Sequence, residues 1–201
     1  MMWFLKGIKK RIKTENLNDK YKIKYPSVLE GKSDYNCPTG AIENNKWVKE
    51  KCIFCEKCDL KPTYNQDMYN INNNIPDIFK KSFYLYSIDS GTCGACNTEF
   101  NTIFSPQYDI NRFKIFLSNT PRHADALVIM GVYTENMDKV IENAYDAMPE
   151  PKLLIGLGAC SVSGGIIGEK ISKKFDIEIL GCPPSPYTII NAILKARGNV
   201  K

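Results

Sequence analysis

The strongest constraint on the fold is an alternation of short apolar runs with helical segments from residue 83 onward. The runs are FYLYSID, FKIFLS, ALVIMG, KLLIGLG and IEILG, and their apolar character is typical of parallel strands that are buried on both faces. Helices are expected near residues 97–104, 135–148 and 186–195. Strand-helix alternation of this kind predicts a doubly wound α/β domain with right-handed crossovers.

Four of the eight cysteines lie in loops of this domain, within the motifs DSGTCGACNTEF, GACSVSGGIIG and LGCPPSPYTII. Cys93, Cys160 and Cys182 each follow a predicted strand, and Cys96 lies one helical turn beyond Cys93. Because sites in such sheets form beyond the carboxyl ends of the strands, the four cysteines are expected to converge at one edge. A C-x2-C pair alone is compatible with a redox dithiol, but a dithiol leaves Cys160 and Cys182 unexplained.

The other four cysteines lie in a compact N-terminal cluster. CIFCEKC supplies Cys52, Cys55 and Cys58 in a C-x2-C-x2-C run, and CPTGAI supplies Cys37 in a Cys-Pro pair fifteen residues upstream. In bacterial ferredoxins such a run takes its fourth ligand from a Cys-Pro pair, so one 4Fe-4S cluster is predicted here. The alternative is a zinc site with four cysteine ligands, which usually has two separated C-x2-C pairs.

Composition bears on the compartment and on the partners. The net charge of +5 is modest and spread along the chain, which does not favour nucleic acid binding. No run of eighteen apolar residues occurs, and residues 1–13 lack the features of a secretory signal, so we expect a cytoplasmic protein. Thiols are kept reduced in that compartment, and eight cysteines are then expected to be metal ligands rather than disulfides.

The chain divides into four predicted parts. Residues 1–30 form a basic N-terminal segment whose start, MMWFLKGIKKRIK, has apolar residues at helical spacing. This start is open to two interpretations, a solvated terminus and an amphipathic helix on a membrane or partner subunit. Residues 31–62 form the ferredoxin-like module, the Asn-rich residues 63–82 a linker, and residues 83–201 the α/β domain.

The three cysteine motifs of the second domain, with NTPRHADALVIMG between them, resemble the small subunit of nickel-iron hydrogenases. They also resemble the homologous cluster-bearing 20 kDa subunit of respiratory complex I, over about residues 83–197. The resemblance implies a flavodoxin-like fold in which Cys93, Cys96, Cys160 and Cys182 hold the 4Fe-4S cluster nearest the active site. The spaced cysteine pair, followed by Asn97, Thr98 and Glu99, is similar to the membrane-bound, energy-converting (group 4) hydrogenases.

The resemblance implies an electron-transfer subunit of an oxidoreductase. Two clusters use all eight cysteines, so the nickel-iron centre is expected on a large partner subunit. Further expected partners are membrane-arm subunits and a ferredoxin or polyferredoxin-like subunit, with the complex on the cytoplasmic face of the membrane. The alternatives are a complex I-like quinone or sulfane reductase subunit without nickel, and a zinc-stabilised interaction protein.

Two further residues, Glu99 and His123, could be considered for a role in the site, and only Glu99 is kept as a candidate. Glu99 lies three residues beyond Cys96, and both a proton relay and a hydrogen bond to the cysteine loop are compatible with that position. No other catalytic residue is expected. His123 is the only histidine, and it is expected to be structural because no nucleophile or metal partner accompanies it.

Overall fold

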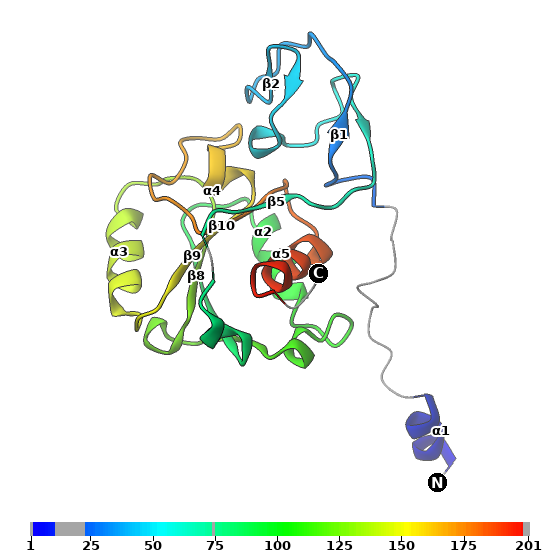
Figure 1. Ribbon diagram of the computed structural model, residues 1–201, viewed down its shortest axis with the longest axis vertical. Coiled ribbons are helices and arrows are strands. Elements are labelled where there is room, and N and C mark those ends of the chain that lie inside the picture. Colours follow the sequence, from blue (N-terminus) through cyan, green and yellow to red (C-terminus); the bar gives the residue numbers. More distant parts are fainter. Residues whose placement is uncertain (1, 11–22, 74, 199–201) are drawn as a thin grey trace.

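The computed structural model describes residues 2–10, 23–73 and 75–198. Its centre is a six-stranded sheet in the order β5 (Tyr69–Ile71), β10 (Ile177–Ile179), β9 (Leu153–Leu157), β8 (Ala126–Met130), β6 (Phe83–Asp89) and β7 (Ile115–Leu117) (Figure 1). All neighbours pair in parallel except β5, which is antiparallel to β10. Numbered in chain order, the five parallel strands follow the flavodoxin-like order 2-1-3-4-5, which confirms the predicted fold.

Helices cover both faces of the sheet. α2 (Ala95–Thr102) and α5 (Pro186–Ala196) pack on one face, where Phe100 and Ile190 join a core with Val128 of β8. α3 (Met137–Ala147) covers the other face, where Ile141 packs with Leu127. Successive residues of β8 thus point into different cores and every residue of the strand is buried, which explains its uninterrupted apolar run. The predicted helices near residues 97–104, 135–148 and 186–195 are confirmed as α2, α3 and α5.

The remaining elements of the α/β part are short. The helix α4 (Ala159–Ser163) follows β9, and three 3-10 turns occupy connections, namely η2 (Asp77–Lys80), η3 (Ile110–Phe113) and η4 (Pro121–His123). His123 is exposed in η4, just before β8 begins. The histidine therefore lies at the amino end of a strand, whereas the cysteines follow the carboxyl ends.

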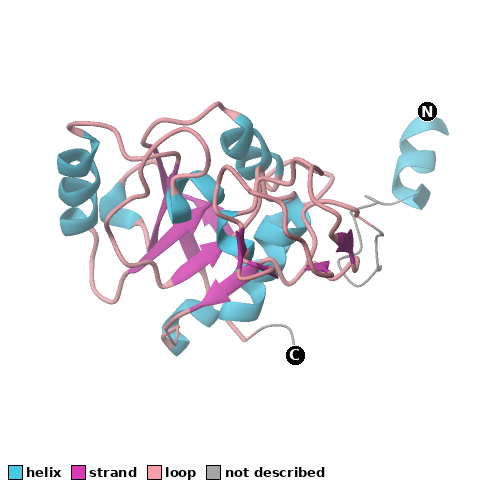
Figure 2. Ribbon diagram, turned by 90° about the horizontal axis from the view of Figure 1, so that it is seen from above, coloured by secondary structure: helices cyan, strands magenta, loops and turns pink. Residues whose placement is uncertain are grey.

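The N-terminal lobe consists mostly of loops with very short strands (Figure 2). β1 (Leu29–Glu30) pairs with β4 (Lys61–Pro62), and β2 (Ile42–Glu43) forms a hairpin with β3 (Lys46–Trp47) before the turn η1 (Lys49–Lys51). Asn44 and Asn45 have φ values of 51° and 59°, the left-handed conformation that two-residue hairpin turns require. The lobe has its own small core around Leu29, Ala41, Cys52 and Leu60.

The segment of residues 63–82 is more than a connection. It contributes the edge strand β5 to the main sheet and buries Met68 and Phe79 completely or almost so. The polar sequence of the segment did not indicate a strand, because an edge strand does not need apolar residues on both faces. The domain boundaries given above remain a prediction.

The helix α1 (Met2–Lys10) precedes the N-terminal lobe in the chain. Leu5 and Ile8 are exposed on it, together with Lys6, Lys9 and Lys10. Across the described ranges, no helix combines the length and the apolar character needed to span a bilayer.

Candidate metal centres

Four cysteines meet at the carboxyl edge of the sheet, as the sequence predicts. Cys93 follows β6, Cys96 lies in the first turn of α2, Cys160 lies in α4 after β9, and Cys182 follows β10. The pKa of Cys96 is raised to about 12, first by burial and then by the charges of Cys160, Cys182 and Cys93. Burial and the neighbouring thiolates also raise the pKa of Cys160 and Cys182. The four sulfurs are therefore within electrostatic reach of one another.

Two glycines allow the backbone to approach these sulfurs. A β-carbon added to Gly158 would stand 2.5 Å from Sγ of Cys96, and one added to Gly165 would stand 3.2 Å from Sγ of Cys160. Their φ values of +92° and +59° lie in the region that favours glycine. The glycines of the GLGAC and SGGIIG segments thus provide room around the cysteines that side chains would fill.

A hydrogen-bond network holds the loop that carries Cys93. The carboxylate of Asp89 accepts from the Gly91 amide at 2.9 Å, from Oγ1 of Thr92 at 2.9 Å and from Nδ2 of Asn97 at 2.8 Å. Burial acts to raise the pKa of Asp89, but these hydrogen bonds outweigh it and lower the pKa. The charged carboxylate therefore fixes the end of β6 to the first turn of α2, on both sides of Cys93. Sequence reasoning missed Asp89, although an Asp just before a glycine turn is a recognisable signal.

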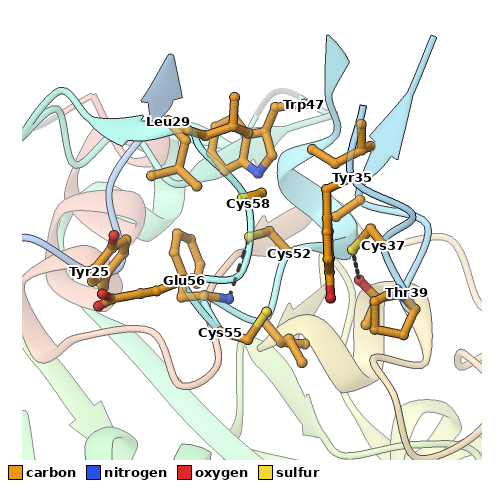
Figure 3. A pocket seen from close by; sticks show the side chains of 16 residues that line it. Tyr25, Leu29, Tyr35, Cys37, Thr39, Trp47, Cys52, Cys55, Glu56 and Cys58 are labelled. Carbon is orange, nitrogen blue, oxygen red and sulfur yellow. Dashed lines mark hydrogen bonds between the residues drawn. The ribbon is translucent and has the colours of Figure 1, made fainter. Parts of the chain in front are cut away.

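The other four cysteines line a single cavity in the N-terminal lobe (Figure 3). Sγ of Cys37 lies 3.3 Å from the Thr39 hydroxyl, and Sγ of Cys52 accepts a hydrogen bond from the Phe54 amide at 3.4 Å. Burial acts to raise the pKa of Cys37, but hydrogen bonds from Thr39, Ala41 and Gly40 lower it on balance. Burial raises the pKa of Cys52, and donation toward its sulfur from the Trp47 side chain and the Phe54 amide offsets part of that rise.

The side chain of Trp47 places a buried hydrogen-bond donor in this cavity. Its indole Nε1 is buried and makes no hydrogen bond of normal geometry among the residues that the structure describes, although it acts on Cys52 as a nearby donor. Figure 3 shows this nitrogen directed toward the sulfurs of Cys52 and Cys58. Buried donors are almost always paired, so the cavity presents a donor suited to an acceptor held by the cysteines. Sequence reasoning did not identify Trp47, because only the hairpin fold turns its ring into the cavity.

The elements that carry the two cysteine sets are in contact. α4, which carries Cys160, packs against η1, which directly precedes Cys52. η1 is tied to the main sheet, because Lys49 Nζ donates to the Tyr69 carbonyl at 3.1 Å. The loop after Cys52 also contributes Phe54 to a cleft whose other wall contains Cys182.

The same cleft contains Glu99, the candidate proton relay. Tyr25, Pro26 and Phe54 line one side, and Glu99 and residues 182–186 line the other. The carboxyl group is partly buried, and this burial raises its pKa. Glu99 therefore stands where the lobe faces the loop of Cys182, not within the Asp89 network that holds the Cys93 loop.

The donor chemistry of both sets fits iron-sulfur clusters. All eight cysteines are free thiols, and each set brings four of them together. Thiolates are the usual ligands of 4Fe-4S clusters, and hydrogen bonds to the sulfurs tune them. Within the ranges that the structure covers, no group of three or more His, Cys, Asp or Glu is positioned to hold a metal ion directly. The assignment of the eight cysteines as ligands remains a prediction.

Comparison with known proteins identifies the family. Residues 93–196, just over half of the chain, match the family of the NADH ubiquinone oxidoreductase 20 Kd subunit. The chain belongs to this family. The match begins at Cys93 and includes all four cysteines at the carboxyl edge of the sheet.

Individual relatives agree with this membership. Formate hydrogenlyase subunit 7 of Escherichia coli is 33% identical over 144 residues, which cover 68% of this chain and 56% of that protein. The probable membrane-bound hydrogenase subunit mbhJ of Pyrococcus furiosus is 29% identical over 145 residues, which cover 67% of this chain and 87% of that protein. A chain in the structure of the membrane-bound sulfane sulfur reductase, an archaeal respiratory membrane complex, is 28% identical with a TM-score of 0.52, and the match covers 60% of this chain and 71% of that one. The chain is therefore an electron-transfer subunit of the hydrogenase and complex I-like type.

Proposed function

We propose that this chain is the electron-relay small subunit of a membrane-associated nickel-iron hydrogenase. It would hold one 4Fe-4S cluster on Cys37, Cys52, Cys55 and Cys58 and a second on Cys93, Cys96, Cys160 and Cys182. Each bound cluster supplies a centre that takes up and releases one electron at a time. The observation that carries the proposal is the meeting of four thiols from three distant segments at the carboxyl edge of the sheet.

The residues of the chain would hold and insulate these centres. Asp89 fixes the loop of Cys93, and Gly158 and Gly165 admit the sulfurs of Cys96 and Cys160. Glu99 would move protons in the cleft beside Cys182, since its partly buried carboxyl has a raised pKa. The docking of η1 on α4 would keep the two cysteine sets close enough for electron exchange.

The hydrogen-activating nickel-iron centre would lie on a large partner subunit beside the second cysteine set. Ile166 and Ile167 follow Gly165 and are 61% and 60% exposed, so they offer an apolar contact surface for that subunit. A ferredoxin or polyferredoxin-like subunit would supply or receive electrons at the N-terminal lobe. Membrane-arm subunits would hold the complex on the cytoplasmic face of the membrane, and the exposed Leu5, Ile8 and lysines of α1 would add contact with anionic lipid.

The test replaces one thiol in the assembled complex. Cys93→Ser should abolish hydrogen-dependent dye reduction, whereas His123→Gln should largely preserve it, because His123 is exposed before β8 and away from the cysteines. Both variants should assemble with the large subunit, which copurification measures. Unchanged dye reduction by the Cys93→Ser complex would contradict the proposal.

A second candidate is a nickel-free sulfane or quinone reductase subunit. The likeness to a chain of the sulfane sulfur reductase favours it, at 28% identity and a TM-score of 0.52. The large subunit of the same complex decides between the two, because a hydrogenase needs two pairs of cysteines there to bind nickel. Nickel in the purified complex together with hydrogen uptake supports the hydrogenase, and sulfane reduction without nickel supports the alternative.

A further inference from the structure

The hairpin of the N-terminal lobe sets the direction of the Trp47 side chain. Trp47 ends β3 and pairs with Ile42 of β2 across the two-residue turn at Asn44 and Asn45. Its ring packs edge-on against Phe54, with centroids 6.4 Å apart and an angle of 71° between the planes. Because a one-residue shift in register would turn the ring to the other face, the hairpin places the indole in the cavity.

The buried indole N–H has no fully formed hydrogen bond, although it lies close enough to Cys52 to act on that thiol as a donor. Nε1 is buried and makes no hydrogen bond of normal geometry within the described part of the chain, while donation from the Trp47 side chain lowers the pKa of Cys52. A buried donor without a well-placed acceptor is destabilising, and the indole nitrogen can donate a hydrogen bond but cannot accept one. In Figure 3 the nitrogen is directed toward the sulfurs of Cys52 and Cys58.

We propose that Trp47 donates its indole N–H to a sulfur of the cluster bound by Cys37, Cys52, Cys55 and Cys58 and thereby raises the reduction potential of that cluster. The inference rests on the proposed function, because it requires a cluster in the N-terminal lobe. The reduced cluster carries one more negative charge than the oxidised one, so a donor to its sulfur stabilises the reduced state more. Trp47 is thus a positioning and tuning residue rather than a catalytic one.

Other donors in the cavity make the contribution of Trp47 separable. The Phe54 amide donates to Cys52, and the Thr39 hydroxyl lies beside Cys37. Neither contact is removed when Trp47 is replaced by phenylalanine, which keeps an aromatic ring and deletes only the N–H and part of the ring. Phe54→Leu is the matched control, because it alters the packing against Trp47 but retains every backbone donor.

The experiment is a redox titration of the complete complex followed by electron paramagnetic resonance. Because loss of the donor destabilises the reduced cluster more than the oxidised one, Trp47→Phe should lower the reduced-to-oxidised ratio of this cluster about tenfold at a fixed potential. For a one-electron couple that change equals ~59 mV. Iron and acid-labile sulfide should stay at the wild-type level. Phe54→Leu and the second cluster should show a much smaller shift.

The outcomes separate the inference from the function on which it rests. An unchanged potential in a Trp47→Phe complex with full iron content would overturn the role of Trp47 and leave the proposed function intact. If the wild-type complex shows no cluster in the N-terminal lobe, neither by iron and sulfide content nor by its resonance signal, the proposed function itself is refuted. If the variant does not assemble, pulsed resonance on the wild-type complex with ¹⁵N-labelled tryptophan gives the answer. Trp3 is the other tryptophan of this chain, so a nitrogen coupling to the reduced lobe cluster that persists in Trp3→Phe supports the inference, and its absence overturns it.

Discussion

Gly158 lies against the sulfur of Cys96, so that a β-carbon at this glycine would stand 2.5 Å from Sγ. No real side chain tolerates such a separation, and Cys96 is buried and cannot easily turn away. Gly158 lies between the end of β9 and the start of α4, whereas Cys96 lies in α2. The contact therefore joins two of the segments that bring the second cysteine set together.

Gly158→Ala should displace Cys96 and prevent binding of the second cluster. The iron and sulfide that belong to this chain, after subtraction of the other subunits, should fall by about half, because one of its two 4Fe-4S clusters is lost. Gly198→Ala is the control, since Gly198 also has a positive φ, +69°, lies outside both cysteine sets, and would bring the added carbon only within 3.7 Å of Cε of Lys80. Chemical analysis of both variants measures the effect. Full iron content in Gly158→Ala would show that the second set does not need this approach.

Asn70 joins the N-terminal lobe to the sheet. Its Nδ2 donates to Glu50 of η1 at 2.8 Å and to Glu178 of β10 at 2.9 Å. Asn70→Asp would replace the shared donor with a third carboxylate, and we expect a loss of about 2 kcal/mol in the free energy of unfolding. Denaturant titration measures the loss, and the magnetic coupling between the two reduced clusters should weaken with it. Adding Glu50→Gln should restore much of the stability, and no loss in Asn70→Asp would refute the role of Asn70.

The buried side chain of Arg197 links the end of α5 to two 3-10 turns through hydrogen bonds. It is 1% exposed, and its guanidinium donates to the carbonyls of Phe79 at 2.8 Å, Phe113 at 2.9 Å and Lys80 at 3.0 Å. Arg197→Met would leave these carbonyls without their donor, so the free energy of unfolding should fall by about 3 kcal/mol. Arg122→Met, at an exposed position, should change it by less than about 0.5 kcal/mol. Equal effects of the two substitutions would contradict the stabilising role of the Arg197 hydrogen bonds.

The partly buried carboxyl group of Asp125 should make the stability of the folded protein depend on pH. Burial raises its pKa, although the Tyr84 amide, which donates to it at 2.7 Å, and Arg197 both act to lower it. Because the ionised form is less favourable in the folded protein than in the unfolded chain, its contribution to stability falls as the pH rises from the ordinary value of 3.8 through the raised pKa.

Asp125→Asn keeps an acceptor for Tyr84 but cannot ionise. Its stability relative to the wild type should therefore increase between about pH 3 and about pH 7, as denaturant titrations at several pH values would measure. A difference that stays constant or falls over this range would contradict the effect of burial.

The sheet was predictable because its central strands are apolar on both faces. FYLYSID, ALVIMG and KLLIGLG contain β6, β8 and β9, and the strand-end rule placed Cys93, Cys160 and Cys182 at one edge without any structural information. The strand β5 was not predicted, because the Asn-rich sequence MYNINNN around Tyr69–Ile71 resembles a loop, and only pairing with β10 makes it a strand.

Other features depend on tertiary contacts that a single sequence does not encode locally. The five-residue helix α4 begins at Ala159 and packs against β9 and η1, and its helical pattern is too short to recognise in the sequence. The inward direction of Trp47 follows from the register of a hairpin with two residues in each strand. The Asp89 network needs the turn that brings Asn97 back to the end of β6.

Iron and acid-labile sulfide analysis of the anaerobically purified complex, combined with electron paramagnetic resonance, tests the central claim most directly. The account predicts about eight iron and eight sulfide per copy of this chain, after subtraction of other subunits, and two distinct reduced-state signals. Cys52→Ser should remove one signal and Cys160→Ser the other. Material that is colourless, contains zinc without inorganic sulfide and gives no reduced-state signal would contradict the account.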